Sequence, residues 1–122
     1  MYVFSFEKLE VWQNSKNLII DIYQTCEYIP KEEKYGLISQ IKRSVISIST
    51  NIAEGTSRET SKDKIHFLNI AFSSAIETLN HLIILNHLNY INEETYLIIR
   101  AKIEKICNQI NSLRKYFQQN LK

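Results

Sequence analysis

Apolar residues recur at steps of three and four over most of the chain, and this spacing predicts amphipathic α-helices. The clearest case lies between residues 35 and 58, where five aliphatic side chains fall on one narrow helical face. These side chains are Ile38, Ile41, Val45, Ile48 and Ile52. We therefore expect a long helix here that packs this face into a hydrophobic core.

The same periodicity predicts four helices in all, over residues 6–28, 31–55, 60–88 and 92–119. Ser5 could cap the first helix, Pro30 lies near the first turn of the second, and Asn92 is a candidate cap for the fourth. Thr60 followed by Asp63 resembles a capping box for the third helix. Gly55 is expected to close the second helix in the left-handed conformation that glycine adopts easily.

Four such helices joined by short turns predict an all-α, antiparallel up-down-up-down four-helix bundle. The 122 residues are enough for a single domain, residues 1–122, and the two glycines and one proline leave few turn signals for a β fold. Apolar runs stay below 18 residues, and the start of the chain lacks the pattern of a signal peptide. We expect a cytoplasmic protein with no membrane partner.

The second predicted helix carries a second, polar stripe on a different face. Glu54 can pair with Arg58 one turn later, and Arg43 and the Asn51 amide could approach the same carboxylate. The stripe consists of Gln40, Arg43, Ser47, Asn51, Glu54 and Arg58. A structural network or a subunit interface is the favoured interpretation, and a ligand or RNA contact is the alternative. A lone carboxylate between cations is a poor general base, so catalysis is not supported.

Charge is unevenly distributed along the chain. Residues 1–99 contain nine basic and twelve acidic side chains, a net charge of −3, whereas residues 100–122 contain six basic and one acidic, a net charge of +5. Two interpretations are open: a surface that binds nucleic-acid phosphates, to which Lys42 or Arg58 could add, or a solvated face whose cations suit the end of a helix. The candidate cations are Arg100, Lys102, Lys105, Arg114 and Lys115.

Patterns for metal, nucleophile or phosphate-loop chemistry are missing from the sequence. His66, His81 and His87 are not spaced to share a helical face, and Cys26 and Cys107 stand far apart, which favours two reduced thiols. The two glycines are too distant from each other for a phosphate loop. We expect no metal, no cofactor and no enzymatic activity.

Four short motifs carry a family resemblance in their order and spacing. They read F-x-x-L-x-V-W-Q from residue 6, P-x-E-E-x-Y-G-L-x-x-Q-I-x-R from residue 30, S-I-x-x-N-I-A-E-G-x-x-R from residue 47, and F-L-x-x-A-x-S-S from residue 67. The chain thereby resembles the four-helix-bundle family of the rRNA intervening-sequence proteins, to which the accessory variability proteins of diversity-generating retroelements are similar. The match runs from residue 6 to about residue 90, and the last helix agrees in pattern only.

The resemblance implies a homo-oligomer, typically a pentameric ring, without enzymatic activity. The retroelement relatives bind nucleic acid and a reverse transcriptase through a basic ring, whereas this chain has a net charge of only +2. Two hypotheses follow. The first is an oligomeric accessory protein that binds RNA or DNA, and a reverse transcriptase or another protein; the second is a scaffold that binds a partner protein and no nucleic acid.

Overall fold

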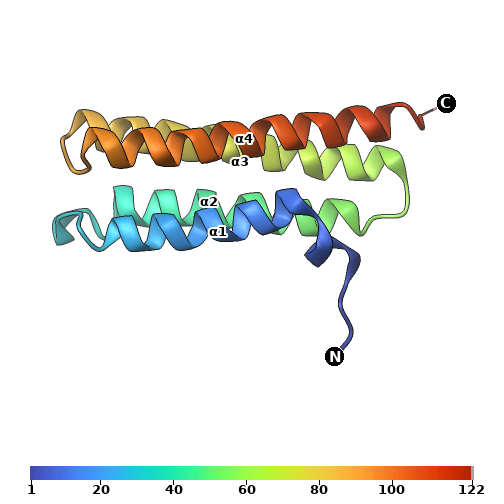
Figure 1. Cartoon of the computed structure of the whole chain (residues 1–122), viewed down its shortest axis with the longest axis horizontal. Helices are drawn as coiled ribbons and strands as arrows, with labels where there is room; N and C mark the ends of the chain where they lie inside the picture. Colours follow the sequence, from blue (N-terminus) through green and yellow to red (C-terminus); the bar gives the residue numbers. More distant parts are fainter. Residues whose placement is uncertain (122) are drawn as a thin grey trace.

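The computed structural model describes residues 1–121, and the regular elements in that range are all helical. Four long helices form a four-helix bundle in which successive helices run in opposite directions (Figure 1). Each long helix packs against two others: α1 contacts α2 and α4, and α3 also contacts α2 and α4. The long helices are α1 (Glu10–Cys26), α2 (Leu37–Thr56), α3 (Ser61–His87) and α4 (Glu93–Gln118), with short 3-10 helices η1 (Ser5–Lys8) and η2 (Lys31–Glu33). The predicted fold class is confirmed.

The core lies along the bundle axis, where the predicted apolar stripes meet. In α2 the five aliphatic side chains of the stripe are all buried, four of them completely. α4 contributes an equally regular set at steps of three and four residues. Its buried side chains are Tyr96, Ile99, Ile103, Ile106 and Ile110.

Two of the predicted helix starts are confirmed by their capping bonds. Thr60 Oγ1 accepts a hydrogen bond from the Asp63 backbone N–H at 3.1 Å, and Asn92 Oδ1 accepts one from Thr95 N–H at 2.7 Å. Each bond satisfies a backbone donor that has no partner within the helix. A side-chain cap can therefore be predicted from sequence when its partner lies a few residues away in the chain.

The first two helices begin later than the sequence predicts. Leu9 has extended backbone angles and separates η1 from α1, so residues 6–28 do not form one helix. After Pro30 the chain makes only the short helix η2, and α2 starts at Leu37 rather than at residue 31. Gly36, with φ −109° and ψ −109°, interrupts the helical path between η2 and α2.

Gly55 has a different role from the predicted one. The backbone at Gly55 is not left-handed, and α2 continues through Thr56. A Cβ atom on Gly55 would lie 2.8 Å from the Cβ of Phe67 and 3.3 Å from the Lys64 carbonyl oxygen. Glycine is needed here because α2 and α3 approach too closely for any side chain.

A ladder of small polar side chains fills the seam between α2 and α3. Ser47 Oγ lies 2.8 Å from Ser74 Oγ, and Thr78 Oγ1 lies 2.9 Å from Ser44 Oγ. Ser44, Ser74 and Thr78 are all buried, which allows the two backbones to come together. Small side chains on both helices thus meet across the seam. Ile76 of α3 lies outside this seam and is 46% exposed.

Candidate interaction surfaces

The polar stripe of α2 divides into a buried part and an exposed part. Asn51 is 9% exposed, and its side-chain amide donates to the Ser47 carbonyl oxygen at 2.8 Å and to Ser47 Oγ at 3.1 Å. Because Ser47 also contacts Ser74, these two stripe residues belong to the α2–α3 ladder. Their observed contacts lie within the chain.

The charged members of the stripe do not gather on one carboxylate. Arg43 pairs with Glu77 of α3 and also donates to the Gln40 side chain at 3.0 Å. Glu54 pairs with Arg58 at 3.4 Å, and the Arg58 guanidinium lies 4.5 Å from the centre of the Phe67 ring. The six residues therefore form three local groups along the α2–α3 seam.

The outer face of α3 has few charges for a helix on the surface of a bundle, and exposed isoleucines alternate there with polar side chains. Ile70, Ile76 and Ile84 are each more than a third exposed, and between residues 65 and 87 the only Asp, Glu, Lys or Arg side chain is Glu77. By length and composition alone, α3 could span a membrane. In its most apolar stretch of 18 residues, 39% is buried in the bundle. The exposed isoleucines are therefore the feature of this face that a partner surface could cover.

Two of the five candidate cations on α4 are directed toward α1. Lys102 Nζ lies 2.5 Å from Asp21 Oδ2, and Lys105 Nζ lies 3.6 Å from Glu10 Oε1. These pairs are partly or largely exposed to solvent, so each contributes little to stability. They nevertheless place two acidic groups beside two of the proposed phosphate-binding cations.

Arg100 and Arg114 lie on the opposite side of α4. Arg100 Nη1 donates to the Tyr96 hydroxyl, which raises the pKa of the Arg100 guanidinium further. Arg114 Nη1 donates to Asn69 Oδ1 of α3 at 2.8 Å, and its guanidinium lies 4.6 Å from the centre of the Phe72 ring. Within residues 1–121, Lys115 alone of the five cations makes no ion pair, hydrogen bond or cation–π contact. The cations therefore do not form one continuous surface.

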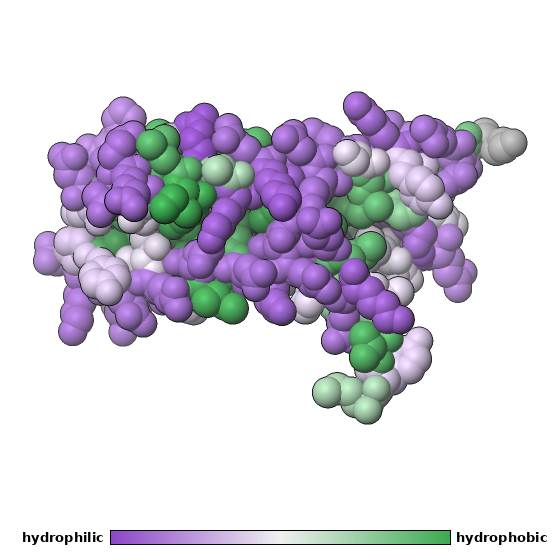
Figure 2. All heavy atoms as spheres, viewed as in Figure 1, coloured by the Kyte–Doolittle hydropathy of each residue, from purple (hydrophilic) through white to green (hydrophobic). Residues whose placement is uncertain are grey.

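The seam between α1 and α4 is more open than the α2–α3 seam. On the face formed by these helices, Figure 2 shows two apolar areas separated by a hydrophilic band. Asp21 and Lys102 lie in the middle of the seam, as does a hydrogen bond of 2.9 Å from Asn14 Nδ2 to Gln109 Oε1. A pocket lies on each side of these contacts.

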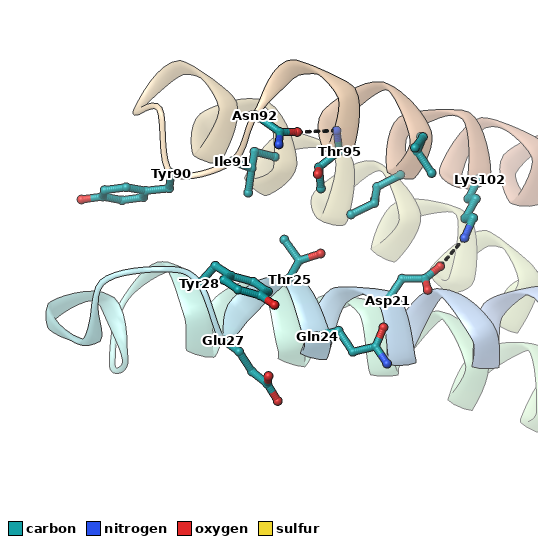
Figure 3. Close-up of a pocket in the computed structure, with 12 residues that line it drawn as sticks. Asp21, Gln24, Thr25, Glu27, Tyr28, Tyr90, Ile91, Asn92, Thr95 and Lys102 are labelled. Carbon is teal, nitrogen blue, oxygen red and sulfur yellow. Dashed lines mark hydrogen bonds and ion pairs between the residues drawn. The ribbon is translucent and has the colours of Figure 1, made fainter.

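The first pocket, the tyrosine pocket, has a volume of about 780 Å³ and lies between the end of α1 and the start of α4. Thr25 and Ile91 project toward each other across it, with Tyr28 and Tyr90 at its outer end (Figure 3). The Tyr90 hydroxyl donates to Glu33 at 3.0 Å, and this bond raises the pKa of Tyr90.

The second pocket, the apolar hollow, has a volume of about 630 Å³ and lies between the start of α1 and the end of α4. Its apolar lining consists of Leu9, Val11, Ala101, Leu113 and Tyr116. The sequence indicates neither pocket, because each is made by side chains that are more than 60 residues apart in the chain.

The thiol and imidazole groups form no chemical cluster in the part of the chain that the structure describes. Cys26 is buried, Cys107 is half-buried, and both are free. Burial raises the pKa of both thiols, which lowers their reactivity at neutral pH. A group of His, Cys, Asp and Glu side chains that could hold a metal ion is not found among residues 1–121.

These features define a small four-helix-bundle protein with a tightly packed α2–α3 side and an open α1–α4 side. The chain belongs to the 23S rRNA-intervening sequence protein family, whose model matches residues 7–112. A similar solved structure is that of a protein with unknown function from the S23 ribosomal protein family of Bacteroides thetaiotaomicron. The two chains are 31% identical with a TM-score of 0.80, over 86% of this chain and 98% of the other. No curated protein matches the chain.

Proposed function

We propose that the protein is a non-enzymatic, cytoplasmic accessory protein that assembles as a homo-oligomer through the outer face of α3. The observation that carries this proposal is the exposure of Ile70, Ile76 and Ile84 on a helix with one charged side chain between residues 65 and 87. The family resemblance supports a pentameric ring.

The physical reason is the cost of leaving an apolar helical face in water. Glu77, the one Asp, Glu, Lys or Arg residue in this stretch, is already paired with Arg43. The exposed isoleucines alternate with exposed polar side chains, namely His66, Asn69, Ser73, Asn80 and His87. α4 is of similar length but has eight charged side chains, as expected for an outer helix. Covering the isoleucines with a second copy removes this apolar surface from water. The Arg43–Glu77 pair, whose side chains are 56% and 36% exposed, would lie at the same contact, already paired within one chain.

Charge substitutions on the α3 face test the assembly. Ile70→Glu and Ile76→Glu should each reduce the oligomer to smaller species in size-exclusion chromatography with light scattering, with unchanged helical circular dichroism. Leu97→Glu is the matched control, since Leu97 is an exposed aliphatic residue on α4. A wild-type protein that elutes as a 14.4 kDa monomer at micromolar concentration would disprove the proposed assembly.

Nucleic-acid binding is the second candidate function, and one observation favours it. The end of α4 and the start of α3 lie together, since Arg114 bonds to Asn69 and Lys64 Nζ lies 5.4 Å from the centre of the Phe117 ring. Lys62 and Lys115 are therefore at the same end of the bundle, and repetition of this end around a ring would multiply its positive field.

Fluorescence anisotropy with a labelled structured RNA tests this second candidate. The double variant Lys62→Gln with Lys115→Gln should bind more weakly and show a flatter dependence on salt than the wild type. The matched control is Lys31→Gln with Lys34→Gln, which removes the same charge at the other end of the bundle. Absence of binding even at low salt would contradict the nucleic-acid hypothesis and favour the alternative, a scaffold that binds a partner protein.

A further inference from the structure

The first residues of the chain form an exposed apolar arm. Residues 1–4, here the amino-terminal arm, leave the bundle at the end where α1 begins and extend away from it (Figure 1). Tyr2 is 76% exposed and Phe4 is 59% exposed, and Val3 between them is 46% exposed. Two aromatic rings and a valine in water form an apolar surface that another surface could cover.

The arm is held firmly at its base. The Phe4 backbone N–H donates to Glu7 Oε2 at 2.7 Å, and the Gln13 side chain donates to the Glu7 carbonyl oxygen at 2.9 Å. The Phe6 ring packs edge-on against Trp12, with ring centres 5.1 Å apart. These contacts fix the backbone where the arm joins η1, which lowers the entropic cost of docking.

The apolar hollow lies at the same end of the bundle as the arm. Leu9 and Val11 border it at the start of α1, and Leu113 and Tyr116 border it at the end of α4. The arm of the same chain leaves in another direction, because η1 packs against α2 as well as α1. The chain thus carries an exposed aromatic segment and an open apolar hollow that the segment does not enter.

We propose that the amino-terminal arm of one copy docks in the apolar hollow of the neighbouring copy. This inference rests on the proposed homo-oligomer and names a second contact within it. One copy gives its arm and receives another arm at a different place, so the contact is heterologous. Such a contact closes into a ring when the rotation between neighbouring copies is a full turn divided by the number of copies. For the pentameric assembly this rotation is one fifth of a turn.

The position of the arm along the bundle selects the apolar hollow over the tyrosine pocket. In a ring whose axis runs along the bundles all copies lie level, so the arm reaches only features near its own end. Figure 1 shows the arm pointing away from the bundle to the side, not along its long axis. The tyrosine pocket begins at Asp21, about 15 Å beyond Val11 at 1.5 Å per helical residue.

Removing the aromatic rings of the arm should weaken assembly without affecting the bundle. The double variant Tyr2→Ala with Phe4→Ala should raise the concentration for half-assembly by about tenfold or more, since aromatic anchors dominate interfaces. The readout is sedimentation velocity over a dilution series, with circular dichroism to confirm folding. Tyr35→Ala is the matched control, because Tyr35 is 88% exposed and lines neither pocket.

Disulfide trapping locates the docked arm. Two variants are made in a Cys107→Ser background, one with Phe4→Cys and the other with Ser112→Cys, and the two are mixed and oxidised. Ser112 is chosen because it is exposed and lines the apolar hollow. We expect a disulfide-linked dimer that contains one chain of each kind. The control replaces Ser112→Cys with Ser57→Cys, an exposed position directly after α2 at the same end of the bundle. An intact oligomer with no link to residue 112, or with an equal link to residue 57, would overturn arm docking alone. A monomeric wild type would overturn the proposed assembly itself.

Discussion

The α2–α3 seam and the α1–α4 seam are built in different ways within one bundle. Between α2 and α3, Gly55 and a ladder of serines and a threonine bring the backbones close, and the polar groups pair inside the seam. Between α1 and α4, longer side chains such as Lys102 and Asp21 bridge a gap that contains two pockets. Small residues thus give a tight, specific contact, and long charged residues leave open surface available for partners.

The largest effect that separates the two seams is expected from Gly55→Ala. Alanine normally stabilises a helix by about 1 kcal/mol relative to glycine. Here the new Cβ would lie 2.8 Å from the Cβ of Phe67, so α2 and α3 must move apart. We expect a loss of about 1–3 kcal/mol in the free energy of unfolding, as for other overpacked sites. Chemical denaturation measures it.

Ser49→Ala is the control for that substitution, since Ser49 lies on α2 and bonds only to the carbonyl oxygen of Ile46 in its own helix. It should leave the stability nearly unchanged or slightly raised. Equal or greater stability of Gly55→Ala relative to the wild type would contradict the account of a close α2–α3 contact.

An intermediate effect is expected from Thr78→Val, which keeps the shape of the side chain and removes its hydroxyl. That hydroxyl lies 2.9 Å from Ser44 Oγ and 2.8 Å from the Ser74 carbonyl oxygen, in a buried position. We expect a loss of about 1 kcal/mol, the net contribution of a buried hydrogen bond. The same denaturation experiment measures it, and a gain in stability would show that the polar ladder does not stabilise the seam.

The smallest effect is expected from Asp21→Asn on the α1–α4 side. The pair with Lys102 joins side chains that are 28% and 47% exposed, and such pairs contribute about 0–1 kcal/mol. Unfolding should therefore change little, and the remaining difference from the wild type should shrink at high salt. A loss greater than that of Thr78→Val would reverse the contrast between the two seams.

Local features of the fold could be predicted from the sequence, and features that depend on distant residues could not. The apolar stripe of α2 and the caps at Thr60 and Asn92 require only neighbours in the chain, and the structure confirms them. The sequence predicts a helix end at Gly55, because its actual neighbour, Phe67, belongs to another helix and leaves no local signal. Thr78 was missed as a core residue because a polar side chain carries no apolar signal until its partner Ser44 is known.

The candidate sites show the same difference between contacts of neighbouring residues and contacts of distant residues. The pair of Glu54 with Arg58 follows from a spacing of four residues and is observed at 3.4 Å. The partners of Arg43 and Lys102 lie 34 and 81 residues away, so no spacing rule could indicate them. The charge of residues 100–122 was visible in sequence, but its division between two sides of α4 was not.

Sedimentation equilibrium of the full chain at several concentrations tests the central claim most directly. The exposed outer face of α3 predicts a stable mass that is a multiple of 14.4 kDa, five copies if the family resemblance holds, and a shift to smaller species for Ile70→Glu. A wild-type protein with the mass of a single chain across that range would contradict the assembly, and with it the proposed role of α3.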